Sequence, residues 1–162
     1  MKTKKSAGIT LVELIVVIAM AGIISAWAVP NLVKMVEMTK LRTAANMIKR
    51  QMLVARTRAI SDPYKHCGVV IDDIKQQSFV FFDNTTPYVV NTADTVNKYG
   101  GIYKMPRGDT LLIPSSNGIQ NQCVVFRGDG SAKYGGSVQV KNKYNMIRTI
   151  TVEASTGRVK VQ

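Results

Sequence analysis

The sequence predicts an α+β protein in which one long N-terminal α-helix packs on antiparallel β-sheets. Three observations support this prediction. A run without charged residues extends from Leu14 to Val33, near the start of the chain. An amphipathic helical pattern follows it, and from His66 onward short β-type runs alternate with turn residues. At 162 residues, the chain has the length of one domain with an extension.

The apolar run is unusual because it contains an acid. The stretch "GITLVELIVVIAMAGIISAWAVP", residues 8–30, has Glu13 as its single charged residue, and a charge in apolar surroundings is costly unless a partner satisfies it. The run is long enough to cross a bilayer core of about 30 Å. It exceeds the roughly 7–15 apolar residues of a secretory signal, and no A-x-A-like cleavage site follows it. An ordinary transmembrane anchor is the other alternative, but an acid here would be unusual in one.

The N-terminus resembles the class III signal of type IV prepilins and pseudopilins. The resemblance rests on the basic leader "MKTKKSAG", the pattern Thr10-Leu11-x-Glu13-Leu14, Gly22 and Pro30. It implies that a dedicated membrane peptidase cleaves between Gly8 and Ile9 and N-methylates Ile9. The apolar helix is then retained and becomes the packing core of a filament. Ile9 stands where the family usually has phenylalanine, which favours a minor pilin or a pseudopilin over a major pilin.

Cleavage would give Glu13 a partner. The new α-amine of Ile9 lies four residues earlier in the sequence, and residues four apart share one face of a helix. A carboxylate in the first turns also complements the helix dipole. Glu13 can therefore pair with an amine, its own or that of a neighbouring subunit. The resemblance implies the neighbour's amine and a role for Glu13 in the axial register of assembly.

An amphipathic helix is predicted to continue the apolar one. Its apolar positions recur at spacings of three and four residues. They are Leu41, Ala44, Ala45, Ile48, Met52, Ala55 and Ala59. The sequence "SDP" at residues 61–63 ends it, so a helix from residue 9 would be about 78 Å long. Gly22 and Pro30 are its expected flexible points, and the resemblance implies that the helix melts between them in assembled pili.

The C-terminal part is predicted to be a β-rich head. "CGVVID" and "QSFVFFD" form a hairpin, and residues 84–109 are expected to be a long polar loop. Further strands are "TLLIP", "NQCVVFRGDGSAKY", "VQVKN" and "NMIRTITVEASTGRVKVQ", the last a hairpin that turns at "ASTG". "CVVFRGDGSA" and "ITVEASTGRVKV" resemble the GspH-type pseudopilin and FimT-like minor pilin head. The predicted segments are therefore a cleaved leader (1–8), an apolar transmembrane or filament-core helix (9–33), an amphipathic helix (34–62) and the head (63–162).

Two cysteines, Cys67 and Cys123, both lie in the head. If the apolar helix carries them across a membrane, they reach an oxidising compartment, where a disulfide between them is expected. Two buried thiols are the alternative. A metal site is not expected, because the chain has one histidine and no CxxC motif.

The net charge of +12 suggests an anionic partner, although solubility and membrane orientation also explain it. Residues 130–162 contain six of the cations and one acid, Glu153. The cations are Lys133, Lys141, Lys143, Arg148, Arg158 and Lys160. Arg158 and Lys160 alternate on a strand and so share a face. FimT-like minor pilins of some bacteria bind DNA through their terminal hairpin, and the resemblance makes Arg158, Lys160 and Arg148 candidates here. A solvated basic strand is the alternative.

No catalytic set, P-loop or dinucleotide fingerprint is found, so neither enzymatic activity nor a cofactor is expected. The resemblance implies a structural subunit of a type IV pilus or of a type II secretion pseudopilus. Its expected partners are the prepilin peptidase, other pilin or pseudopilin subunits, an inner-membrane assembly platform and, in the DNA-uptake alternative, DNA. The expected location is the inner membrane with the head in the periplasm, and then the filament. A solitary membrane-anchored periplasmic binding module is the alternative from another class.

Overall fold

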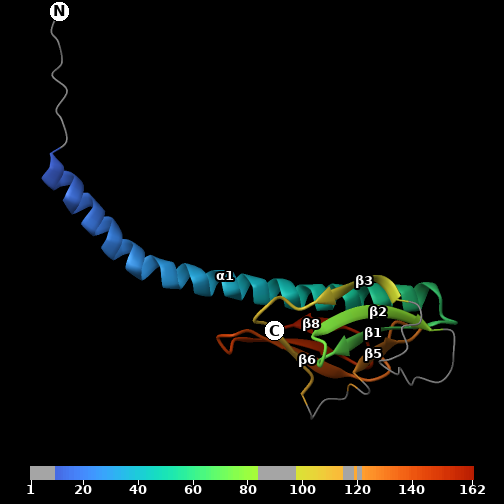
Figure 1. The fold of residues 1–162 in the computed structure, drawn as a ribbon. Coiled ribbons are helices and arrows are strands. Elements are labelled where there is room, and N and C mark those ends of the chain that lie inside the picture. The colour runs from blue at the N-terminus through green and yellow to red at the C-terminus, as the bar shows by residue number, and fades with distance from the viewer. Residues whose placement is uncertain (1–9, 84–97, 115–118, 120–121) are drawn as a thin grey trace, which may run out of the picture. The chain divides into compact units, whose positions relative to one another are not determined.

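The computed structural model describes residues 10–83, 98–114, 119 and 122–162 of the chain. In these residues the chain forms one helix and then eight strands in two sheets (Figure 1). The fold has two compact units, one that ends at Glu37 and one from Met38 to Gln162. The second unit is called the head below.

Helix α1, Leu11–Ser61, contains both the apolar and the amphipathic parts of the predicted helix. Pro30 lies inside it, and it ends at Ser61, directly before the predicted stop. The amide of Asp62 still donates to the carbonyl of Arg58 at 2.9 Å. Pro63 cannot continue the helix, because it lacks an amide hydrogen and disfavours helical backbone at the preceding residue.

The head contains two four-stranded antiparallel sheets. The strands are β1 (His66–Asp72), β2 (Gln77–Asp83), β3 (Lys98–Lys104), β4 (Thr110–Leu112), β5 (Cys123–Phe126), β6 (Gly136–Lys141), β7 (Ile147–Val152) and β8 (Val159–Val161). Sheet A has the order β3-β2-β1-β5, and sheet B has the order β4-β6-β7-β8. The α+β class and the helix packed on antiparallel sheets are confirmed.

One core joins the helix to both sheets. From Leu41 onward, the predicted apolar stripe of α1 is buried, as are the inner faces of the sheets. Sheet A contributes Cys67, Val69, Ile71, Val80, Val124 and Phe126, and sheet B contributes Leu111, Val138, Val140, Ile150, Val152 and Val159. A polar contact crosses the same interface, where Ser78 Oγ donates to Gln51 Oε1 at 2.6 Å. The head therefore has a closed core of its own.

Strand β3 corrects the sequence prediction, which placed a loop over residues 84–109. Residues 98–104 form an edge strand of sheet A, paired with β2 and interrupted by a register shift between Ser78 and Val80. Gly100 and Gly101 lie inside β3, and Gly100 has a φ of 77°. Glycine weakens the sequence signal of a strand and often marks such an irregularity. The rest of the predicted loop, residues 84–97, lies outside the described residues.

The side chain of Gln76 connects the two sheets. Gln76 is the last residue of the β1–β2 turn and lies in the left-handed region, with a φ of 53°. Its Nε2 donates to the carbonyl of Leu111 at 3.2 Å, and its Oε1 accepts the amide of Leu111 at 2.5 Å. One side-chain amide therefore satisfies both backbone groups of a residue in β4, an edge strand of sheet B.

Candidate functional site

Thr10 and Glu13 begin helix α1. The Thr10 hydroxyl oxygen accepts the amide of Glu13 at 3.3 Å, and the Thr10 carbonyl accepts the amide of Leu14 at 3.2 Å. This is the geometry of an N-cap, and Thr10-x-x-Glu13 has the spacing of a capping box. The sequence contains this signal, but the sequence prediction related Glu13 only to the new terminus and to the helix dipole, and it missed the cap. Gly8 and Ile9 lie outside the described residues, so their cleavage and the pairing of Glu13 with an amine stay predictions.

The first part of α1 exposes its apolar side chains. Leu11 and Ile23 are each 74% exposed and Trp27 is 77% exposed. By length and composition, α1 is the one helix among the described residues that could cross a membrane. Such surface is costly to leave in water at about 25 cal/mol per Å², and exposed apolar patches of this kind mark contact with lipid or protein.

The polar side chains within this apolar segment bond to the backbone of their own helix. Ser25 Oγ donates to the carbonyl of Ala21 at 2.7 Å, and Asn31 Nδ2 donates to the carbonyl of Trp27 at 3.3 Å. The Ser25 hydroxyl hydrogen and one Asn31 N–H are therefore satisfied without water. The segment is therefore compatible with an apolar environment around it. A Cβ on Gly22 would meet no atom within 4 Å, so close packing inside the chain does not explain this glycine.

The structure contradicts the predicted disulfide. Cys67 and Cys123 are both buried free cysteines. They lie on neighbouring strands, but Cys67 pairs with Phe126 and Cys123 pairs with Val70. Three residue steps therefore separate them, about 10 Å along the strands, whereas bridged cysteines have their Cα atoms within about 7 Å. Their side chains also belong to different clusters, that of Cys67 to the main core and that of Cys123 to a second group with Val70 and Phe79.

The terminal hairpin exposes the two cations that the sequence places side by side. Arg158 and Lys160 are exposed on either side of buried Val159, so they share the outer face of sheet B. Arg148 does not join them, because it lies opposite Val140, on the inner-facing side of the sheet and at the far end of β7. The outward positions of β6, β7 and β8 contain no acid. They are Ser137, Gln139, Lys141, Ile147, Thr149, Thr151 and Lys160.

Sequence reasoning missed the residue that holds this hairpin. Arg56 Nε donates to the carbonyl of Gly130 at 2.9 Å, and a terminal nitrogen of Arg56 donates to the carbonyl of Thr156 at 3.0 Å. Helix α1 is thereby joined to the turn after β5 and to the β7–β8 turn. In the sequence, Arg56 is one of several cations on an amphipathic helix, and no local pattern distinguishes it.

Metal binding and nucleophilic chemistry would depend on the described cysteine, histidine and acidic side chains. Within the described residues, no group of three or more histidine, cysteine or acidic side chains is arranged to hold a metal ion. Burial raises the pKa of both thiols, that of Cys67 to about 11. A high pKa suppresses the thiolate, which is the nucleophilic form. Neither thiol is therefore a nucleophile of ordinary reactivity at neutral pH.

These observations define a protein with an exposed apolar N-terminal helix and a separately closed α+β head. Residues 3–29 match the model of the prokaryotic N-terminal methylation motif. One similar structure is the minor pseudopilin EpsH from the Type 2 Secretion System of Vibrio cholerae, with a TM-score of 0.54 and 11% identity over 76% of this chain and 96% of that one. Another is the type IV minor pilin FimU of Pseudomonas aeruginosa, with a TM-score of 0.57 and 13% identity over 78% of this chain and 90% of that one.

A search of curated protein sequences finds no match to this chain. The methylation motif and the two structures nevertheless agree with each other. The chain is type IV pilin-like in its N-terminal motif and in its fold.

Proposed function

We propose that this chain is a non-enzymatic minor pilin or pseudopilin that polymerises through its N-terminal helix after cleavage between Gly8 and Ile9. The observation that carries the proposal is the contrast within α1. Before residue 37 its apolar side chains are exposed, whereas from Leu41 onward its apolar stripe is buried in the head. Exposed apolar surface of this extent requires lipid or other helices around it. A membrane provides the first before assembly, and neighbouring subunits provide the second in the filament.

Glu13 has a specific role in this proposal. When an apolar helix packs among other helices, a carboxylate in its first turn is buried at the least free-energy cost if it pairs with a cation. The methylated amine of a neighbouring subunit is such a cation. A buried ion pair contributes little to stability but fixes register well. Glu13 would therefore set the axial position of each new subunit, while the head decorates the filament surface.

The test is the mature N-terminus. The full chain is co-expressed with a prepilin peptidase, and its terminus is determined by mass spectrometry in membranes and in sheared filaments. A chain that begins at N-methylated Ile9 in both fractions supports the proposal. A chain that keeps Met1 beside an active peptidase, or that is cut beyond Pro30, would support a solitary membrane-anchored binding module instead.

The proposal covers two filament systems, a type IV pilus and a type II secretion pseudopilus. A deletion strain separates them, because loss of surface pili and loss of protein secretion are distinct phenotypes. Complementation with the parent chain is the control. Restoration of one phenotype alone assigns the system.

DNA binding by the terminal hairpin is the second candidate. Arg158 directly precedes the edge strand β8 and Lys160 lies in it, both exposed on one face, and two adjacent cations can contact successive phosphates. The acid nearest in register is Glu153, whose amide donates to the carbonyl of Arg158 and whose carboxylate accepts the hydroxyl of Thr156 at 2.8 Å. Binding of this kind would be sequence-independent and strongly salt-dependent.

A further inference from the structure

A second set of cations surrounds the end of the head that is closed by the β6–β7 turn, residues 142–146. These cations, called the basic rim, are Arg107, Lys141, Lys143 and Arg148. Lys141 ends β6 opposite Ile147, and Arg148 lies opposite Val140. A Cβ on Gly108 would lie 3.9 Å from Cδ of Lys143, so the turn that carries Arg107 adjoins the β6–β7 turn.

The β6–β7 turn is held in one conformation. The buried Asn142 accepts the amides of Tyr144 and Met146 with its Oδ1, each at 3.0 Å. Its backbone amide donates to the carbonyl of Met146 at 3.0 Å, and Asn145 is left-handed with a φ of 61°. The backbone of the turn is therefore already ordered before binding, and the ordering cost that remains is that of the outer side chains.

The outer side chains of this end are cationic, aromatic and apolar together. Lys143 Nζ lies 5.3 Å from the centre of the Tyr144 ring, and Tyr144 and Ile147 are 42% and 48% exposed. In residues 104–110 and 138–150, the one acid is Asp109, which is buried. Cations beside exposed tyrosine and isoleucine are the composition that favours a membrane interface.

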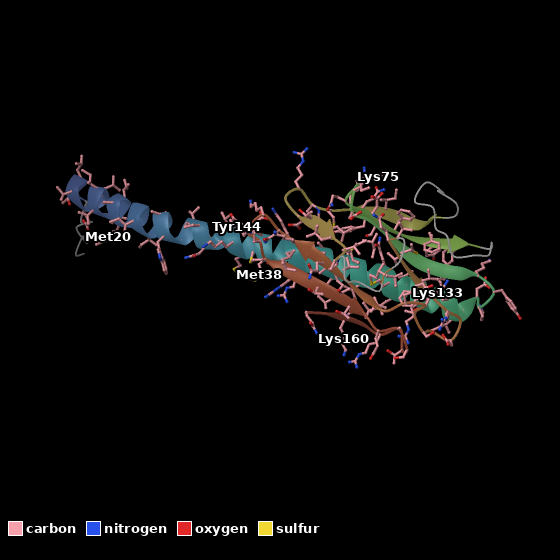
Figure 2. The ribbon with its side chains drawn as sticks, turned by 90° about the horizontal axis from the view of Figure 1, so that it is seen from below. Met20, Met38, Lys75, Lys133, Tyr144 and Lys160 are labelled. Carbon is pink, nitrogen blue, oxygen red and sulfur yellow. The ribbon has the colours of Figure 1, made fainter. Side chains whose placement is uncertain are left out.

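The same end of the head is tethered close to the apolar segment. Figure 2 shows Tyr144 at the end of the head where Met38 begins it. Val33 is the last residue of the uncharged run, five residues before Met38, and five residues span at most about 17 Å in any conformation. Residues 37–45 add the exposed cations Lys40 and Arg42 and one acid, the buried Glu37. If residues 9–33 lie in a bilayer, this end is held near the headgroup region.

We propose that the basic rim binds the anionic phosphate headgroups of the bilayer in which residues 9–33 are embedded. The unassembled subunit is then held with this end of its head on the lipid surface, and assembly must release it. The inference rests on the proposed membrane-anchored state. The partner is lipid rather than DNA, because the tether gives headgroups a high local concentration and because Tyr144 and Ile147 suit an interface. Arg158 and Lys160, the DNA candidates, lie toward the opposite end of β7.

Amide hydrogen exchange of the full chain in lipid nanodiscs tests the proposal. One set of discs contains phosphatidylcholine alone and the other contains phosphatidylcholine and phosphatidylglycerol in equal parts. We expect slower exchange of residues 141–148 in the anionic discs. Each cation near such a surface changes the bound population about fivefold. The double variant Lys141→Gln/Lys143→Gln should therefore abolish most of the difference, while the matched double variant Arg158→Gln/Lys160→Gln should keep it.

Two further measurements distinguish failure of membrane insertion, absence of headgroup binding and binding of another anion. Co-elution of the chain with both kinds of disc reports insertion of the helix. Failure to insert would overturn the anchored state and the inference together, whereas insertion with equal exchange in both discs would overturn the inference alone. Duplex DNA and inorganic phosphate are added separately to the neutral discs. Protection of residues 141–148 by either of them, equal to that in anionic discs, would assign the rim to that ligand and contradict the proposal.

Discussion

Arg56 Nε lies 2.9 Å from the carbonyl oxygen of Gly130, to which it donates a hydrogen bond across 74 residues of sequence. The same guanidinium reaches the carbonyl of Thr156. One side chain of helix α1 thus fixes two turns of the head, and the second of these presents Arg158. A residue of the helix thereby positions the candidate binding surface.

We expect Arg56→Ala to destabilise the head by about 2 kcal/mol or more, because hydrogen bonds from charged donors contribute about 1.5–3 kcal/mol. Arg56→Lys keeps the charge but loses the second donor position, so its cost should be smaller. The measurement is thermal unfolding of the detergent-solubilised full chain by near-ultraviolet circular dichroism. Arg50→Ala, at an exposed site on the same helix, is the control. Equal midpoints for the Arg56 and Arg50 variants would contradict the proposed role.

Gly157 provides a second test of the same junction. It has a φ of 61°, and a Cβ there would lie 2.0 Å from the carbonyl oxygen of Gly130. Gly157→Ala should therefore cost about 3 kcal/mol, from backbone strain and from the displaced turn. Gly101→Ala is the matched control, because a Cβ there meets no atom within 4 Å. A Gly157 variant as stable as the Gly101 variant would show that the turns do not pack as described.

Sequence patterns predicted the parts of the fold that depend on local periodicity. The stripe from Leu41 to Ala59 is buried, because positions three and four apart share a helical face. The pattern failed where contacts are long-range. Strand β3 is stabilised from outside its own sequence, since Arg58 stacks 4.5 Å from the centre of the Tyr99 ring and Phe82 packs edge-on against that ring.

The cysteines illustrate the same limit within the candidate sites. The sequence predicted that each cysteine begins a strand of the head. It could not predict the register of β1 with β5, and in that register three residue steps separate the two cysteines, too far for a disulfide bond. Arg158 and Lys160 share a face because alternation along a strand is local. The separation of Arg148 from them follows from pairing with Val140, which no local pattern encodes.

The buried thiols should make the free energy of unfolding decrease as the pH rises in the alkaline range. Burial first, and the Asp62 carboxylate second, raise the pKa of Cys67 from 9.0 to about 11, and burial also raises the pKa of Cys123. The folded state therefore keeps protons that the unfolded chain loses. This contribution is fully present below pH 9.0 and decreases as the pH rises toward 11, by at most about 1.4 kcal/mol per pH unit for each thiol.

The check is the pH dependence of unfolding free energy for the parent and for Cys67→Ala, which should have the shallower slope above pH 9.0. Identical slopes would contradict the raised pKa. Ellman's reagent tests the same thiols independently. Both should resist it at pH 8 in the folded chain and react after unfolding without reductant, whereas a chain with no reactive thiol after unfolding would contain the disulfide that the structure lacks.

DNA binding by the terminal hairpin predicts a defined salt dependence. If Arg158 and Lys160 each contact a phosphate, the double variant Arg158→Ala/Lys160→Ala should reduce the salt slope of log K by about 2. Fluorescence anisotropy of a labelled duplex across a salt series measures this slope. Lys75→Ala is the matched control, because Lys75 is an exposed cation in the β1–β2 turn of sheet A and belongs neither to the hairpin nor to the basic rim. An unchanged slope in the double variant would remove the hairpin from any DNA site.

The variant Glu13→Ala should distinguish insertion of the helix into the membrane from incorporation of the subunit into filaments. Glu13→Ala removes the single charge of the apolar segment, so insertion into the membrane should be at least as efficient as in the parent. The Thr10 cap still bonds the amide of residue 13, so the helix should begin at the same place. Without the carboxylate, however, the new amine of a neighbouring subunit lacks its partner, and incorporation into sheared filaments should fall severalfold. Glu153→Ala, which removes one acid from the head surface, is the control. Equal incorporation of both variants would refute a role for Glu13 in register, while loss of the Glu13 variant from membranes would show that the acid acts before assembly.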